Sequence, residues 1–272
     1  MTWYCAKSIE IYKYADDDRK FPIMFDENLY LVEAGSFSEA KSRSVSFAEE
    51  KAAVWNSPLY VGGVKGRLVA AGLRSIEKLT VNRIKTGTVV SRSLFEPTNP
   101  EDASLFVQQS KALPVLYLNQ DKRLRIMRKE ILTVQENSLE AKQSEELWWQ
   151  SAHIIYSLTS EHSRPLILEE VVVFEFLSPD WSEAEMFGTA QGLSSTVAFD
   201  GTRYLVHFEG VRQVNLIPDA VVGIGPHGFN EITYSKFAIG SHQQLEKLLG
   251  NQDCIVESLP ASLCNLEVPG ST

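Results

Sequence analysis

The sequence predicts an α+β fold made of two similar units, each a small antiparallel sheet of order strand, strand, helix, strand, strand that packs on a helix. Three observations lead to this prediction. The stretch from Trp3 to Phe95 recurs in diverged form from Trp149 to Phe237. In the second copy Tyr204, Val206 and Phe208 alternate with Leu205, His207 and Glu209, which is the pattern of a strand with one buried face. A helix-start signal lies at the same place between strands in each copy.

The first predicted strand begins each copy. Three apolar residues recur at identical intervals, as Trp3, Ala6 and Ile9 in one copy and as Trp149, Ala152 and Ile155 in the other. Taken alone, the sequence around Trp149 could form an amphipathic helix. Its match to the Trp3 block favours a strand from Trp149 onward. A second strand follows in each copy, at 22–33 and at 165–175.

A helix is predicted after the second strand. Ser38-Glu-Ala40 matches Ser182-Glu-Ala184, and a capping residue precedes each glutamate by three positions, Ser36 in the first copy and Asp180 in the second. In this capping box the cap side chain accepts a hydrogen bond from a first-turn amide while the glutamate reaches back toward the cap. Both copies should therefore begin a helix here.

The last two predicted strands of each unit also recur, and the residues of the first of them are spaced identically in both copies. Leu68, Gly72, Arg74, Ile76 and Leu79 recur at the same intervals as Val206, Gly210, Arg212, Val214 and Ile217. A final strand is predicted at 88–92 in the first copy and at 232–236 in the second. It ends at Phe95 in the first copy and at Phe237 in the second. The predicted organisation is therefore a first unit at 1–98, a connecting segment with a helix and a hairpin at 99–146, a second unit at 147–257 and a flexible tail at 258–272.

Composition bounds the function. The chain has 272 residues, 44% of them hydrophobic, and a formal charge of -9. An acidic chain is a poor general nucleic-acid binder, because that binding depends on basic residues that release counterions, and it favours basic partners. We expect a cytoplasmic protein, since the first residues lack a secretory signal and no apolar stretch is long enough for a membrane span.

Signatures of common chemistry are mostly missing from the sequence. The cysteines Cys5, Cys254 and Cys264 show no zinc or redox spacing, and the histidines show no metal-binding spacing, so we expect neither a metal nor a cofactor. The segment 223–228 matches a dinucleotide fingerprint, but the sequence after it predicts a strand where that site needs a helix. A glycine-rich hairpin loop is the better interpretation.

Charged residues that both copies retain are the candidate binding residues. The six are Glu33 with Glu175, Arg74 with Arg212, and Arg92 with Lys236. Two similar units could present two similar charged surfaces that grip one partner. Alternatively, each pair closes a cross-strand salt bridge inside its own sheet, for example from Arg74 to Glu33, which contributes only some tenths of a kcal/mol.

Three blocks carry a family resemblance: Trp3-Tyr-x-Ala-Lys7, Glu27-Asn-Leu-Tyr-Leu-Val-Glu-Ala34 followed by Ser38-Glu-Ala40, and Gly87-Thr-Val-Val-Ser-Arg92. Together they resemble a bacterial domain of unknown function, number 4288. The resemblance covers the first copy; the second copy has His153 in place of Lys7 and lacks the Gly-Thr pair. It implies no catalytic residues. It does imply a setting of bacterial conflict, in which immunity-like proteins occur.

The leading hypothesis is a non-enzymatic bacterial protein-binding module, an immunity or defence-associated protein that neutralises a basic toxin or effector. The alternative is an enzyme, a hydrolase or nuclease-like effector, with an unfamiliar site at the junction of the two units that uses His207, Glu209 and His227. A third possibility is a structural subunit of a larger complex.

Overall fold

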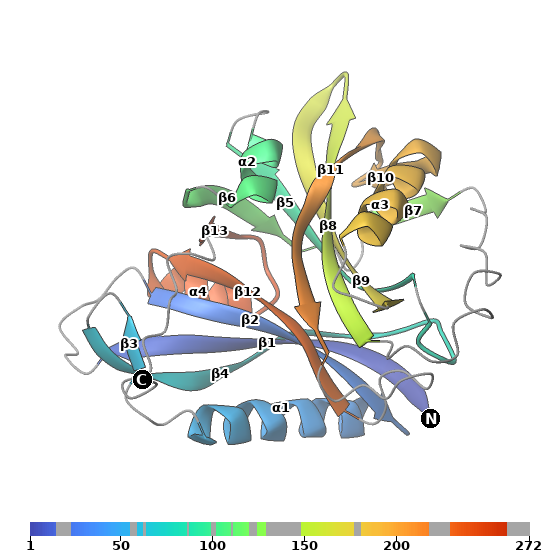
Figure 1. Ribbon diagram of the computed structural model, residues 1–272. Helices are drawn as coiled ribbons and strands as arrows, with labels where there is room; N and C mark the ends of the chain where they lie inside the picture. The colour runs from blue at the N-terminus through green and yellow to red at the C-terminus, as the bar shows by residue number, and fades with distance from the viewer. Residues whose placement is uncertain are drawn as a thin grey trace.

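The structure is a computed structural model that describes residues 1–14, 23–54, 59–61, 64–85, 87–98, 102–109, 111–119, 124–128, 148–176, 181–217 and 229–259. Long strands dominate these ranges and form one sheet, and Figure 1 shows the strands of its two halves running in different directions. In chain order the elements are β1 (Thr2–Tyr14), β2 (Ile23–Ala34), α1 (Phe37–Val54), β3 (Leu59–Val61), β4 (Val64–Lys78), β5 (Thr88–Pro97), α2 (Asp102–Gln108), β6 (Leu113–Leu118), β7 (Leu124–Arg128), β8 (Trp148–Ser160), β9 (Ser163–Phe176), α3 (Ser182–Ser194), β10 (Ser195–Phe199), β11 (Thr202–Leu216), β12 (Phe229–Ile239), α4 (His242–Leu249) and β13 (Cys254–Ser258).

The predicted fold of two small sheets, each packed on its own helix, is wrong. All strands of the described ranges belong to one 13-stranded sheet in the order β3-β4-β1-β2-β12-β13-β6-β5-β9-β8-β11-β10-β7, and every neighbouring pair is antiparallel. The sheets merge because the last strand of each copy crosses to the other. Strand β5 pairs with β9, and β12 pairs with β2.

The repeat is nevertheless visible in matching details of the backbone. The order strand, strand, helix, strand, strand occurs in both copies, with one short strand added after each helix. Gly72 and Gly210 both adopt positive φ, 140° and 148°, at irregularities of equivalent strand pairs. The Leu79 amide donates to the Trp3 carbonyl at 2.8 Å, and Ile217 donates to Trp149 at the same distance.

The correspondence extends beyond the residues that the sequence matched. Helix α2 with β6 follows β5 just as α4 with β13 follows β12, and β6 and β13 pair with each other at the centre of the sheet. The hairpin predicted within the connecting segment does not form between β6 and β7, because β6 pairs with β5 and β13 whereas β7 pairs with β10. Residues 135–146 and 260–272 lie outside the described ranges.

In the described part of the chain, helices begin where the sequence predicted them. The Glu39 amide donates to Ser36 Oγ at 3.1 Å, as the capping box predicts. Glu39 Oε2 reaches back as predicted, but it accepts from the amide of Gly35, at 2.8 Å, and not from that of Ser36. Helix α3 begins at Ser182 without a side-chain cap, and its predicted cap lies outside the described residues. The predicted strand from Trp149 is present as part of β8.

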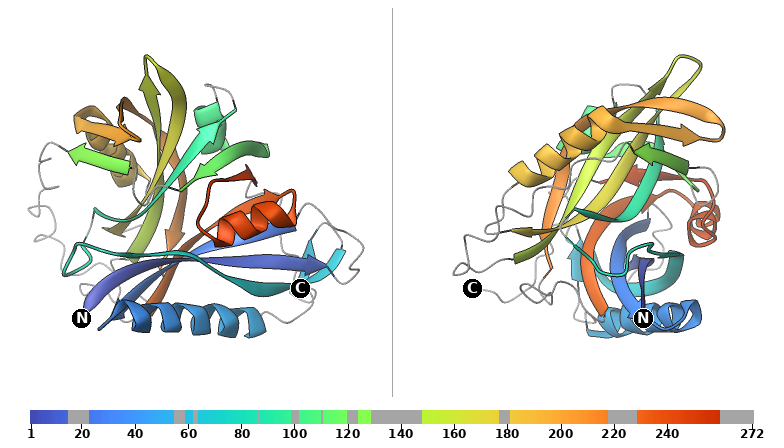
Figure 2. Two further views of the ribbon diagram at one scale, coloured as in Figure 1. Left: turned by 180° about the vertical axis from the view of Figure 1, so that it is seen from behind. Right: turned by 90° about the vertical axis from the view of Figure 1, so that its right-hand side faces the viewer.

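Helices α1 and α3 cover the two outward faces of the sheet, and Figure 2 shows them on opposite outer sides of the molecule. The inward faces of the two halves meet in the interior. Alternate residues of β1 point inward there, and their counterparts on β8 do the same, so that both faces of these strands are buried. The central apolar cluster contains residues of both copies, including Ile9 with Ile155 and Phe95 with Phe237.

Candidate functional site

A strip of ionisable side chains lies in the middle of this apolar interior. On β1 the inward residues run Trp3, Cys5, Lys7, Ile9, and only Lys7 is charged. His153 occupies the same position on β8, because both residues face the corresponding places of the next strand, Leu29 and Val171. Burying an ionisable group is costly unless it is paired, so these positions need a specific explanation.

The first cluster surrounds Lys7, whose exposed fraction is only 3%. Its Nζ donates to the Arg92 carbonyl at 2.6 Å, to Ser93 Oγ at 2.9 Å and to Tyr117 Oη at 3.2 Å. Tyr117 in turn donates to Glu27 Oε1 at 2.8 Å. Burial alone would lower the pKa of Lys7, but Tyr117 and Glu27 raise it above its ordinary value, so the amine stays charged.

Arg74 completes the first cluster from β4. Its guanidinium lies 3.8 Å from the centre of the Tyr117 ring, a cation–π contact, and its Nη1 donates to the Leu248 carbonyl at 3.4 Å. Burial raises the pKa of Tyr117 to about 12, and Glu27 adds to the rise. The phenol therefore remains a neutral hydrogen-bond donor at physiological pH.

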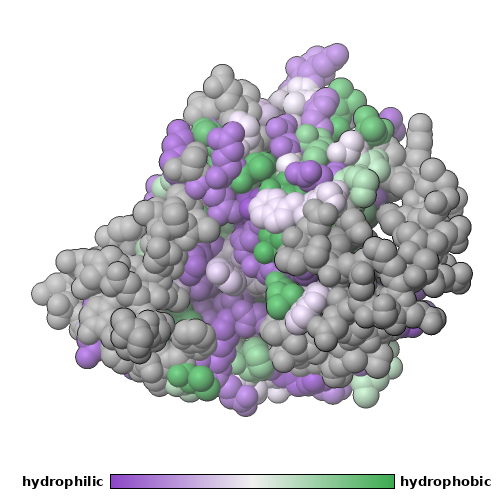
Figure 3. Space-filling model, in the orientation of Figure 1, coloured by the Kyte–Doolittle hydropathy of each residue, from purple (hydrophilic) through white to green (hydrophobic). Residues whose placement is uncertain are grey.

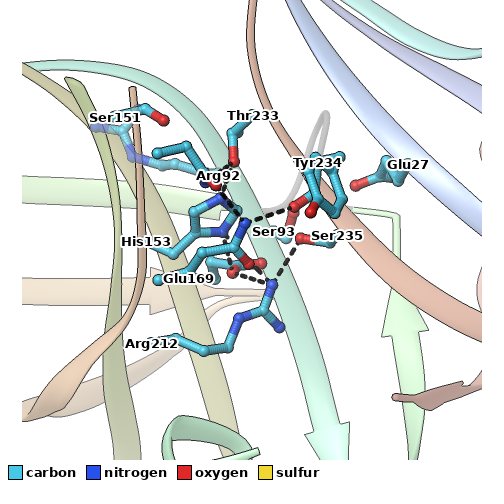
Figure 4. Close-up of polar contacts among 12 residues, drawn as sticks. Glu27, Arg92, Ser93, Ser151, His153, Glu169, Arg212, Thr233, Tyr234 and Ser235 are labelled. Carbon is cyan, nitrogen blue, oxygen red and sulfur yellow. Dashed lines mark hydrogen bonds and ion pairs between the residues drawn. The ribbon is translucent and has the colours of Figure 1, made fainter. Parts of the chain in front are cut away.

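The second cluster surrounds His153, which is fully buried. His153 Nδ1 lies 2.7 Å from Glu169 Oε1, and Nε2 lies 2.5 Å from Thr233 Oγ1. Arg212 Nη2 contacts Glu169 at 2.9 Å and donates to Ser235 Oγ at 2.6 Å. Figure 4 shows these side chains converging from β8, β9, β11 and β12.

Protonation in the second cluster follows from burial and charge. Burial lowers the pKa of His153, which is therefore neutral at pH 7. Burial would raise the pKa of Glu169, but Arg212 and His153 together lower it to about 2, so it is a carboxylate. The carboxylate fixes the proton on Nδ1 of the imidazole, which leaves Nε2 to accept from the hydroxyl of Thr233.

The two clusters share one plan. Lys7 corresponds to His153, Glu27 to Glu169, Arg74 to Arg212 and Ser93 to Ser235, as the strand registers show. A difference lies in the carboxylate. Glu169 contacts its arginine directly, whereas Glu27 accepts a hydrogen bond from Tyr117.

The six charged residues that both copies retain lie apart from one another in the structure. Arg74 and Arg212 are buried at 4% and 7% exposure, so they cannot form an outer charged surface. Arg92 Nε contacts Glu170 Oε1 at 2.8 Å across the β5–β9 seam, and Lys236 Nζ contacts Asp26 Oδ1 at 3.0 Å across β12–β2. The six do not come together as one site.

The proposed pairing of Arg74 with Glu33 does not occur, since Arg74 lies over Tyr117 and Glu33 faces Trp3 at the far end of β1. Glu175 likewise faces Trp149. The match of Arg92 with Lys236 is also wrong. The strand registers place Arg92 opposite Glu170 and Tyr234 opposite Asn28, which are equivalent positions.

The residues of the enzyme hypothesis lie elsewhere. His207 and Glu209 are exposed on β11, and Glu209 Oε1 accepts from Ser157 Oγ at 2.5 Å. His227 and the glycine motif at 223–228 lie outside the described residues, although β12 does begin directly after that motif. Among the described residues no group of three His, Cys, Asp or Glu side chains could hold a metal ion.

Sequence reasoning missed Glu27, His153, Glu169, Thr233 and Ser235 as a group. A usable signal existed at Lys7, a charged residue at an inward position of an otherwise apolar alternation, and the change from Lys7 to His153 between the copies kept an ionisable side chain there. The partners could not be found in this way, because they come from strands far apart in the sequence.

Comparison with known proteins identifies no relative: no family model, curated protein or solved structure matches the chain. The resemblance to the domain of unknown function stays a prediction that rests on its motifs. Within the described part of the chain, no helix is long and apolar enough to cross a membrane.

Proposed function

We propose that the protein is a non-enzymatic protein-binding module that binds its partner through the outward face of α3. The partner surface that it covers has an apolar centre and a basic rim. One observation carries the proposal. Helices α1 and α3 are equivalent in the repeat, yet their outward faces differ in chemistry. The exposed residues of α1 include Glu39, Lys41, Glu49 and Glu50, as expected for a helix that faces water.

Helix α1 also exposes two large apolar residues, Phe37 and Val54, but they lie at its opposite ends, whereas those of α3 lie on one face. Met186 and Leu193 lie seven positions apart on one face of the helix and are 65% and 87% exposed, and Trp181 at its start is 44% exposed. In Figure 3, apolar side chains gather at the upper right, where Figure 1 places α3. Exposed apolar residues that share one helix face are typical of interaction sites.

The charge of α3 indicates the chemistry of the partner. The sequence of the helix contains two glutamates and neither lysine nor arginine, whereas α1 has three residues of each sign. The whole chain carries a formal charge of -9. Acidic residues around an apolar centre complement a basic rim and steer such a partner by long-range attraction. A basic toxin or effector, as an immunity protein would neutralise, fits this description.

The test compares α3 with its counterpart α1. We expect that Met186→Lys combined with Leu193→Lys weakens binding of the basic product of the adjacent gene by about 100-fold, because two apolar contacts are lost and like charges oppose. Val54→Lys, at a residue of α1 that is 80% exposed, is the matched control and should leave binding unchanged. Isothermal titration measures both. Equal binding by all variants would contradict the use of α3, and no binding by the wild-type chain would contradict the proposed partner.

A second candidate function is acyl or phosphoryl transfer at the junction of the two units. It is supported by one observation, the chain of hydrogen bonds from Glu169 through neutral His153 to the hydroxyl of Thr233. A carboxylate that orients a histidine, which in turn accepts from a hydroxyl, is the arrangement of an activated nucleophile. It ranks second because His153 is fully buried and Thr233 is only 3% exposed.

A fluorophosphonate probe tests this candidate. Thr233 Oγ would attack phosphorus while its proton passes to His153 Nε2, and fluoride would leave as the new oxygen–phosphorus bond forms. We expect labelling of the wild-type chain to be lost in Thr233→Val and reduced at least about 100-fold in His153→Gln. Mass spectrometry of the labelled peptide measures the result. A wild-type chain that stays unlabelled would rule out this nucleophile.

A further inference from the structure

Each half of the chain lacks part of its own sheet. Strand β2 of the first half is bordered by β12 of the second over the registers from Val32 opposite Phe229 to Ile23 opposite Ile239. In the same way β9 of the second half is bordered by β5 of the first. The exchange is reciprocal, so each half both gives and receives a strand.

The helices that follow the exchanged strands cross with them. Helix α4 reaches the first half, where Arg74 donates to the Leu248 carbonyl. Helix α2 reaches the second half, where Phe106 lies under Arg212 at 4.8 Å and Gln109 Nε2 donates to the Arg212 carbonyl at 3.2 Å. The two crossings are equivalent, because each helix packs at the arginine retained on the third long strand of the other copy, β4 or β11.

Ion pairs also join the halves. Arg92–Glu170, Lys236–Asp26 and Lys51–Glu231 all connect residues of different halves, at 2.8, 3.0 and 2.7 Å. The central apolar cluster is shared as well, since Phe237 stacks on Phe25 with 5.4 Å between ring centres. Each half therefore takes a strand, a helix and part of its apolar core from the other.

We propose that the chain is a dimer fused into one polypeptide: residues 1–128 and 148–259 recognise each other as two subunits do, and the covalent connection between them is not needed for assembly. The surface on each half is an open strand edge with an apolar interior and a charged seam. Its partner is the other half of the same chain. This inference does not depend on the proposed function.

The experiment uses the full chain with a site-specific protease sequence inserted between Arg128 and Trp148. After cleavage of the folded protein, we expect the two pieces to elute from a sizing column as one particle of the uncut size. After separation in urea, the mixed pieces should recover the circular dichroism spectrum of the intact chain, whereas either piece alone should not. Two separate folded particles after cleavage would overturn the proposal.

A pair of matched variants tests the seam itself. We expect Arg92→Gln to raise the dissociation constant of the cleaved pieces by on the order of tenfold, because it removes the ion pair that Arg92 forms with the buried Glu170 carboxylate. Arg164→Gln breaks a pair with Glu96 across the same seam, but Arg164 is 83% exposed, so an effect below about fivefold is expected. Dissociation constants that change no more for Arg92 than for Arg164 would contradict recognition through this seam.

Discussion

Glu169→Ala is expected to lower the free energy of unfolding by about 3–5 kcal/mol at pH 7, because it leaves Arg212 and His153 buried without their carboxylate. Urea denaturation followed by circular dichroism measures the change. Glu161→Ala is the matched control, since the side chain of Glu161 is 93% exposed, and it should change the stability by less than about 0.5 kcal/mol. Equal effects of the two substitutions would show that the buried cluster contributes little to stability.

The same carboxylate predicts the direction of the pH dependence. The pKa of Glu169 is lowered to about 2 from its ordinary 4.5, so its contribution is complete above about pH 4.5 and is lost as the pH falls toward 2. The loss should reach about 3 kcal/mol in the wild-type chain and be missing from Glu169→Ala. The lowered pKa of His153 acts in the same direction below its ordinary 6.5, because only the unfolded chain then gains a proton there.

Gly188→Ala is expected to destabilise the protein by about 1–3 kcal/mol, although alanine in a helix interior normally stabilises relative to glycine by about 0.5–1 kcal/mol. A Cβ at this position of α3 would lie 2.3 Å from Phe208 Cε2 and 2.9 Å from Ile154 Cγ2. Both neighbours belong to the packed core under the helix, so they cannot move away without disturbing it.

The control for this substitution is Gly240→Ala, where an added Cβ would meet nothing within 4 Å. Thermal unfolding of both variants compares them, and a change of 1 kcal/mol corresponds to a shift of about 2–4 °C in a chain of this size. A Gly188→Ala protein as stable as the wild type would mean that α3 does not pack on β11 as closely as the structure has it.

Local elements followed from the sequence because local physics decides them. The capping residues at Ser36 and the apolar pattern that begins at Trp149 depend on neighbours a few positions away, and both gave the correct element. The internal repeat even identified a strand that its own periodicity left ambiguous. The pairing of strands could not be predicted in this way. An alternating pattern indicates that one face of a strand is buried, but it does not indicate which strand lies beside it.

The candidate site shows the same limit. Arg74 and Arg212 stood out in the sequence as residues kept in both copies, and both belong to the buried clusters. Their role was misjudged, because their positions in the two copies do not reveal whether they face solvent or the other half. Helix α3 was predicted to begin at the right place, but its unusual outward face became apparent only beside α1.

The sequence by itself determined that this chain repeats one order of strands around a helix, because identical intervals of apolar residues predict the same local structure in both copies. The tertiary structure alone decided that the two units exchange β5 and β12, form one continuous sheet and enclose two ionisable clusters between them. The reason is that an unpaired strand edge can pair with a strand of either copy, and a buried charge can be paired by either copy. Only the geometry of the two copies together decides which strand and which side chain serve as partners.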